Sequence, residues 1–207
     1  KSGAGLTLPV AMSSLAPGLL VAAPPLTDPN FNRSVVLLAA HGEDGAFGWV
    51  LNGRRLMSLA ELVTHTDLKC DPIRSEGSVC LGGPVGQGQV WLLYRTEERP
   101  REVSDEHQFD LGIGVTASTS QRVLEAMVRG PAPKSLRGVM GFANWEPWQL
   151  EDEIRVGAWL PTDAEASLVF DASTQDLWTR AYERVGASPI GFGGWHVGAS
   201  ERNRWPS

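Results

Sequence analysis

Two consecutive apolar runs, residues 34–40 and 46–51, constrain this chain more than any other feature of its sequence. Nearly every position in both runs is apolar, whereas a strand with one solvent-facing side alternates apolar and polar residues. The segment between them, HGEDG, contains Asp44-Gly45, and glycine supplies the positive φ of a tight reversal. The runs therefore predict a β-hairpin that the rest of the domain covers on both faces.

Other elements follow from shorter patterns. Strands are predicted at residues 19–23, 79–81, 89–95, 111–117, 136–142 and 167–170. Helices are predicted at residues 58–65 and 118–129 after Ser-x-x-Glu/Gln capping boxes, and at 147–156 and 174–185. Strands and helices do not alternate regularly, which favours a single α+β domain over a βαβ winding.

Composition excludes several classes of protein. A chain of 207 residues can bury about 70% of its surface in one core. Its net charge of −6 argues against nonspecific binding to nucleic acid, which requires a dense basic face. No apolar run reaches the length of a membrane span. Cys70 and Cys80 are too far apart for a typical zinc pair, and two reduced thiols favour a cytoplasmic protein.

The ends of the chain differ from its middle. The start, KSGAGLTLPVAMSSLAPG, lacks the pattern of a signal peptide, and Met12 is the expected native start. Residues 1–14 are predicted to be a flexible segment or a non-native remnant, and residues 15–186 the domain. Residues 187–207 form a Gly/Ser/Trp-containing tail, in which Trp195 and Trp205 could dock on a partner or pack back on the domain.

No catalytic or cofactor motif is complete. GGPVGQGQ lacks the Lys and Ser/Thr of a phosphate-binding loop, so a turn is the preferred interpretation, although its backbone amides could still bind an anion. Gly112-Ile113-Gly114 matches the start of a dinucleotide-binding motif, but no full strand precedes it and no acidic residue follows at the distance that this motif requires. The sequence has no G-x-S-x-G elbow and no paired histidines, so no metal, cofactor or catalytic set is expected.

Tryptophan is frequent, with 8 in the chain. Four are predicted to lie in the core because they fall within apolar strands or amphipathic helices: Trp49, Trp91, Trp159 and Trp178. Trp145 and Trp148 bracket a strand-to-helix junction, where a cleft wall and a core position are equally expected.

Three blocks occur in order along the chain. They are PGLLVAAPPLTDPNFNRSVVLLAAHGEDGAFGWVLN, VCLGGPVGQGQVWLLYR and GFANWEPWQLEDEIRVGAWLPTDAEASLVFD. Together they resemble the YqgE/AlgH family of bacterial proteins, with its D-P-x-F step, its G-G-P-V turn and its G-W-x-x-x-Q-L-E-x-E-I segment. With the helix DLWTRAYERVG, the resemblance covers residues 15–186.

The resemblance implies a compact α+β domain whose bent, bifurcated, mostly antiparallel sheet forms a pseudo-barrel flanked by helices. It brings no catalytic residues, and some family members carry the label of transcriptional regulator. The chain departs from the family pattern at Trp148, where a Gly is common, and at Gly53-Arg54-Arg55, which replaces a basic residue and Pro.

Any ligand site is expected among the 28–33 loop (DPNFNR), the 82–85 turn and the start of the helix after Trp145. The candidate ligand-binding residues are Asp28, Asn30, Phe31, Arg33, His41, Gly82, Gly83, Pro84, Val85, Trp145, Gln149 and Glu151. The preferred interpretation of the 28–33 loop is a structural polar network, in which Arg33 pairs with Asp28 or with Glu151 or Glu153.

The leading hypothesis is a non-enzymatic cytoplasmic domain that binds a protein or small molecule in regulation. One alternative is a transcriptional regulator that contacts DNA. The other is a hydrolase or transferase that uses Asp28, His41 and the backbone amides of Gly82 and Gly83.

Overall fold

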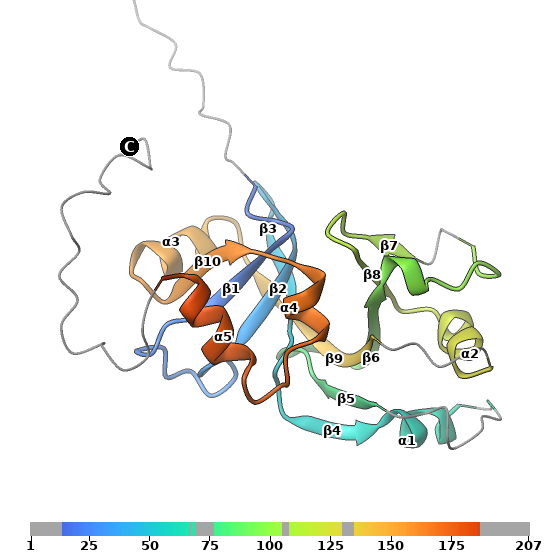
Figure 1. The fold of residues 1–207 in the computed structure, drawn as a ribbon. Helices are drawn as coiled ribbons and strands as arrows, with labels where there is room; N and C mark the ends of the chain where they lie inside the picture. The colour runs from blue at the N-terminus through green and yellow to red at the C-terminus, as the bar shows by residue number, and fades with distance from the viewer. Residues whose placement is uncertain (1–13, 67, 69–76, 105–107, 130–134, 187–207) are drawn as a thin grey trace, which may run out of the picture.

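The computed structural model describes residues 14–66, 68, 77–104, 108–129 and 135–186 (Figure 1). The strands are β1 (Gly18–Ala22), β2 (Val35–Gly42), β3 (Gly45–Val50), β4 (Arg55–Ser58), β5 (Ser78–Leu81), β6 (Val85–Arg95), β7 (Phe109–Asp110), β8 (Val115–Ser118), β9 (Leu136–Trp145) and β10 (Trp159–Asp163). The α-helices are α1 (Leu59–Thr64), α2 (Gln121–Arg129), α3 (Gln149–Arg155), α4 (Ala166–Phe170) and α5 (Leu177–Arg184).

The strands form one curled, mostly antiparallel sheet with helices around it (Figure 1). Its order is β10-β1-β2-β3-β9-β6-β8-β7, with β5 also on β9 and β4 on β5. The only parallel pair in the described residues is β5 with β9. This is the bent, branched α+β fold that the sequence predicts.

The β2–β3 hairpin is buried on both faces, as its apolar runs predict. Consecutive strand residues point to opposite faces, so Leu37 packs with Trp178 of α5 while Leu38 packs on the α3 side with Trp159. Both leucines are fully buried. Burial of each such side chain contributes about 1.5–3 kcal/mol, which favours this register over a shift by one residue.

A third core lies between β6 and helices α1 and α2. Val123 and Met127 of α2 pack with Leu92 and Tyr94 of β6, which confirms the predicted helical spacing. The capping box that the sequence predicts at Ser58 is present at the start of α1. Within the described part of the chain, no helix has the length and apolar character needed to cross a membrane.

Strand β9 is the branch point of the sheet. Along one edge it pairs with β5 through residues 138–140 and then with β3 through residues 143–145, while β6 pairs along the other edge. Gly141, with φ of +76°, lies where the partner changes. A Cβ atom there would lie 2.7 Å from the Val85 oxygen and 2.8 Å from the Gly83 oxygen, so only glycine fits without displacement.

Two predicted strands are wrong. The segment 167–170 belongs to helix α4, and a run this short gives no period that separates strand from helix. The predicted strand 111–117 is interrupted, because the Asp110 carboxylate accepts the Gly112 amide at 2.8 Å and forms a turn between β7 and β8. The cap of α2 also lies later than predicted, since the Ser120 hydroxyl accepts the Arg122 amide at 3.2 Å.

Candidate functional site

The 28–33 loop is shaped by Asp28. Its carboxylate accepts the Asn30 amide at 2.8 Å, and its carbonyl accepts the amides of Phe31 and Asn32 at 3.0 and 2.8 Å. These bonds form a tight turn that sends Phe31 toward the core and leaves Asn30 exposed. Asp28 therefore acts first as a turn former, which is the role that Asp before Pro favours.

Phe31 leads into an aromatic cluster behind the hairpin. Its ring stacks on Trp145, with centroids 6.2 Å apart, and meets Trp159 edge-on at 5.5 Å. The Glu153 carboxylate accepts both indole N–H groups, at 3.0 and 2.8 Å, and also the Gln149 amide at 2.8 Å. Trp145 is thus a core residue rather than a cleft wall, and Gln149 supports the core from α3.

His41 and Glu151 form a hydrogen-bonded pair beside this cluster. His41 Nδ1 accepts the Leu15 backbone amide at 3.0 Å, which assigns the ring proton to Nε2. The Nε2–H group donates to the Glu151 carboxylate at 2.9 Å, and the His41 side chain is only 2% exposed. A general base needs a nitrogen that can accept a proton from the substrate, and here both nitrogens are engaged.

The 82–85 turn joins β5 to β6 by close backbone packing. Gly82 bonds to β9 through its amide at 2.7 Å and to β3 through its carbonyl at 2.8 Å. A Cβ atom on Gly83 would lie 2.1 Å from the Phe142 carbonyl carbon. Pro84 and Val85 are exposed, and Val85 begins β6 opposite Phe142. The glycines therefore serve the corner of the sheet, and the following GQGQ is a bulge in β6.

A polar cleft of about 320 Å³ lies where the 28–33 loop meets the segments that follow β3 and β5. Its lining brings together three of the predicted residues: Asn30, Arg33 and Gly83. It adds others that the sequence analysis did not select: Asn32, Ser34, Asn52, Arg54 and Gln87. We call this the loop cleft.

Arg33 occupies an unusual position in the loop cleft. Its φ is +52°, a left-handed conformation that is costly for a residue with a side chain. Its guanidinium carbon lies 4.7 Å from the centre of the Trp178 ring, in a cation–π contact. The expected ion pairs of Arg33 with Asp28, Glu151 or Glu153 are wrong, because no ion pair joins Arg33 to a carboxylate in the described residues.

Asn52 fixes the floor of the loop cleft. Its side-chain oxygen accepts the Val35 amide at 2.8 Å, and its nitrogen donates to the Arg33 carbonyl at 2.8 Å. Arg54 follows it on the surface and, like Arg33, has no ion pair with any carboxylate in the described residues. The only sequence signal for this part of the site is the local excess of basic residues at Arg54-Arg55, for which solvated surface is the preferred interpretation.

The tryptophans divide as follows. Trp49, Trp159 and Trp178 are buried as predicted, whereas Trp91 is only partly buried. Trp148 is 57% exposed at the start of α3 and does not line the loop cleft. The predictions for Trp195, Trp205 and Cys70 fall outside the described residues, whereas Cys80 is a free, buried thiol.

The geometry defines a class of protein: a single α+β domain with a curled sheet, a doubly buried hairpin and a polar cleft beside it. A family model described as AlgH-like matches residues 19–190, and the chain belongs to this AlgH-like family. The expected resemblance is thereby confirmed.

Solved structures agree with this assignment. The solution structure of the AlgH protein from Pseudomonas aeruginosa is 30% identical, with a TM-score of 0.68, and the match covers 96% of this chain and 100% of that one. A crystal structure of a protein from Corynebacterium diphtheriae is 26% identical, with a TM-score of 0.63, covering 82% and 86%.

Two sequence relatives support the same assignment. A UPF0301 protein of Anaeromyxobacter dehalogenans is 39% identical over 188 residues, which covers 88% of this chain and 93% of the relative. A UPF0301 protein of Myxococcus xanthus is 38% identical over 179 residues, covering 86% and 94%. These matches establish the family and the fold.

Proposed function

We propose that this chain is a cytoplasmic, non-enzymatic domain that binds a small anionic molecule in the loop cleft and acts in regulation through that binding. The observation that carries the proposal is that two arginines, Arg33 and Arg54, line the same cleft. Neither forms an ion pair with a carboxylate in the described residues. Guanidinium groups bind carboxylates and phosphates through paired hydrogen bonds. The volume of the cleft suits a small metabolite.

The neutral groups of the loop cleft support the same ligand. Ser34 lines the cleft, but its hydroxyl oxygen is sealed from solvent, so the contacts to a ligand fall to the more exposed amides. Asn30, Asn32 and Gln87 add amide groups that orient a polar ligand.

The hydrogen bonds of His41 support a non-enzymatic role. Its two nitrogens are held by the Leu15 amide and the Glu151 carboxylate, away from any proton transfer to a ligand. None of the residues that line the loop cleft is a histidine, cysteine or carboxylate. The cleft therefore offers groups for binding an anion and none for general acid–base catalysis.

A thermal-shift and calorimetry screen tests the proposal, with dicarboxylates, phosphorylated metabolites, nucleotides and duplex DNA as probes. A ligand at 100 times its Kd adds about 2.7 kcal/mol, a shift of about 5–10 °C for a chain of this size. We expect Arg54→Gln to weaken binding at least ten-fold. Arg55→Gln, which changes the neighbouring arginine outside the cleft, is the matched control and should leave binding unchanged.

Two results would overturn the proposal. One is a ligand whose affinity falls equally in Arg54→Gln and Arg55→Gln, because the cleft would then not be selective. The other is the absence of any small-molecule shift together with salt-dependent binding of duplex DNA, which would favour the DNA-binding alternative.

A further inference from the structure

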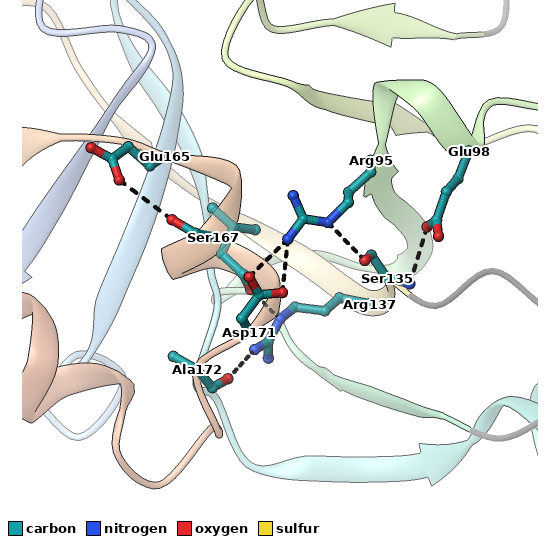
Figure 2. A network of polar contacts seen from close by, with 9 residues as sticks. Arg95, Glu98, Ser135, Arg137, Glu165, Ser167, Asp171 and Ala172 are labelled. Carbon is teal, nitrogen blue, oxygen red and sulfur yellow. Dashed lines mark hydrogen bonds and ion pairs between the residues drawn. The ribbon is translucent and has the colours of Figure 1, made fainter.

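Two arginines on adjacent strands anchor the segment that follows α4 (Figure 2). Arg95 of β6 donates from Nη2 to both oxygens of Asp171, at 2.7 and 2.9 Å, and from Nε to the Ser135 hydroxyl oxygen at 2.9 Å. Asp171 is therefore neutralised by Arg95. Arg137 of β9 lies beside this pair but makes a different set of contacts (Figure 2).

Arg137 donates only to neutral carbonyl groups in the described residues. Its Nε donates to Val169 at 2.5 Å, its Nη2 to Ala172 at 2.8 Å and its Nη1 to Leu51 at 3.4 Å. The first two carbonyls lie at and just beyond the C-terminal end of α4, so Arg137 stabilises that end of the helix. A carbonyl carries only a partial charge, however, and no carboxylate pairs with Arg137.

The environment of Arg137 makes its positive charge costly. Desolvation by burial lowers the pKa of Arg137, which is opposed only by the neighbouring Cys80. A guanidinium has five N–H groups, so its three bonds leave N–H groups without a partner in the described residues. Arg137 is half-buried, and a cation that is partly removed from water is stabilised by a nearby anion.

A cavity of about 160 Å³ lies against Arg137. Its polar lining comes from Ser78, Cys80 and Ser135, and its apolar lining includes Leu51 and Phe170. Ser135 accepts from Arg95 through its oxygen, which leaves its own hydroxyl hydrogen able to donate. The lining contains hydrogen-bond donors and no carboxylate, and the volume is well above the minimum that holds one water molecule.

We infer that this cavity is a second ligand site, separate from the loop cleft, which binds a small tetrahedral oxyanion such as phosphate or sulfate as the counter-charge of Arg137. The oxyanion accepts from the remaining guanidinium N–H groups and from the hydroxyls of Ser78 and Ser135. The volume of about 160 Å³ fits a free ion, and glycerol phosphate serves as the probe that distinguishes it from the phosphate group of a larger metabolite.

Calorimetric titration with inorganic phosphate and with sulfate, at constant ionic strength set by chloride, tests this site. We expect Ser78→Val to weaken phosphate binding at least ten-fold, since it removes a donor and fills the cavity. Arg137→Lys should do the same, and its folding is checked by circular dichroism. Arg55→Gln, which changes an arginine outside both this cavity and the loop cleft, should leave phosphate binding unchanged.

Alkylation of Cys80, which lines the cavity, gives a readout that needs no substitution in the lining. In a Cys70→Ser chain, phosphate should slow the reaction of Cys80 with iodoacetamide at least five-fold, and chloride or glycerol phosphate should not. No phosphate binding, or binding that Arg54→Gln abolishes and Ser78→Val leaves intact, would overturn the inference. Equal protection by glycerol phosphate would overturn the selection of a free ion.

Discussion

At the scale of single residues, Glu153 is the acceptor on which two buried tryptophans depend. Glu153→Ala leaves the indole N–H groups of Trp145 and Trp159 without this acceptor. Each unsatisfied buried donor costs about 1–3 kcal/mol, so we expect the free energy of unfolding to fall by about 2–4 kcal/mol. Urea unfolding followed by tryptophan fluorescence measures the change.

Asp152→Ala is the control for Glu153→Ala. Asp152 lies on the same helix, but its carboxylate is exposed and pairs only with Arg155 on the surface. Such surface pairs contribute little, so its effect should stay within about 0.5 kcal/mol. Comparable losses in the two variants would show that the helix as a whole, rather than the acceptor, determines stability.

Trp148 is strained where the family pattern commonly has glycine. Its φ is +67° and its side chain is 57% exposed, so the ring gains little from burial. We expect Trp148→Gly to raise the free energy of unfolding by about 0.5–1 kcal/mol, since glycine adopts this conformation without steric cost. Trp148→Ala keeps the strained Cβ and should give no gain, and a gain equal to that of glycine would contradict the explanation. Chemical denaturation measures both.

Residue patterns predicted some of these roles and missed others. Asp28 was identified as a turn former because that bond is local to its loop. The contact of Arg33 with Trp178 joins residues far apart in sequence, and no pattern indicates which of many partners an arginine selects. Arg33 was therefore assigned to carboxylates that turned out to be engaged elsewhere.

At the scale of elements, the glycine at the branch of β9 differs from other left-handed glycines in how closely the backbone surrounds it. Gly141 and Gly112 share a φ of +76°, but a Cβ on Gly141 would lie 2.7 Å from a carbonyl oxygen, whereas Gly112 has open space. We expect Gly112→Ala to cost about 1–2 kcal/mol for its backbone conformation. Gly141→Ala should cost at least about 2 kcal/mol more, because backbone must also move.

Thermal and urea unfolding of the two alanine variants give this difference directly. Since their φ values match, the difference reports the steric contact at the branch. Equal losses would mean that β9 adjusts to a Cβ at Gly141 and that the branch tolerates other residues.

Element prediction succeeded where a pattern was long or had a specific cap, as in the β2–β3 hairpin and the capped helix α1. It failed for α4, where four apolar residues fit a strand and a helix equally. The choice of helix there depends on tertiary contacts, including the Arg137 bond to Val169, that no local window contains.

At the scale of the whole molecule, the chain has 2 tyrosines, and the fold affects both in the same direction. Desolvation by burial raises the pKa of Tyr94 and of Tyr182. Because the folded pKa lies above the unfolded value of about 10, the fold holds the phenolic protons. Their contribution to stability is present below about pH 10 and is lost as the pH rises further.

We therefore expect tyrosinate to form in the same step as alkaline unfolding, without an earlier step near pH 10. Ultraviolet absorbance of tyrosinate and near-ultraviolet circular dichroism, recorded together, test this expectation. A tyrosinate signal in a chain that keeps its native dichroism would contradict it. Tyr182→Phe should halve the absorbance change and leave a single coincident transition.

The sequence predicted the fold more completely than the candidate site. The resemblance of the three blocks to the family implied the branched sheet, whereas periodicity and turn chemistry, which are local properties, predicted only individual strands and helices. The loop cleft depends on Arg54, Asn52 and Gln87, which come from segments that meet only after the sheet curls. Each of these polar residues is also typical of an exposed surface, so only the folded arrangement identifies them as part of a cleft.

The branch at β9 also affects how the chain is made. During synthesis the β2–β3 hairpin leaves the ribosome long before β9, yet β3 depends on the last residues of β9 for its second neighbour. Until then the nascent chain exposes an apolar strand edge, which is the feature that promotes aggregation. We therefore expect the first half of this molecule to be prone to aggregation until residue 145 has emerged.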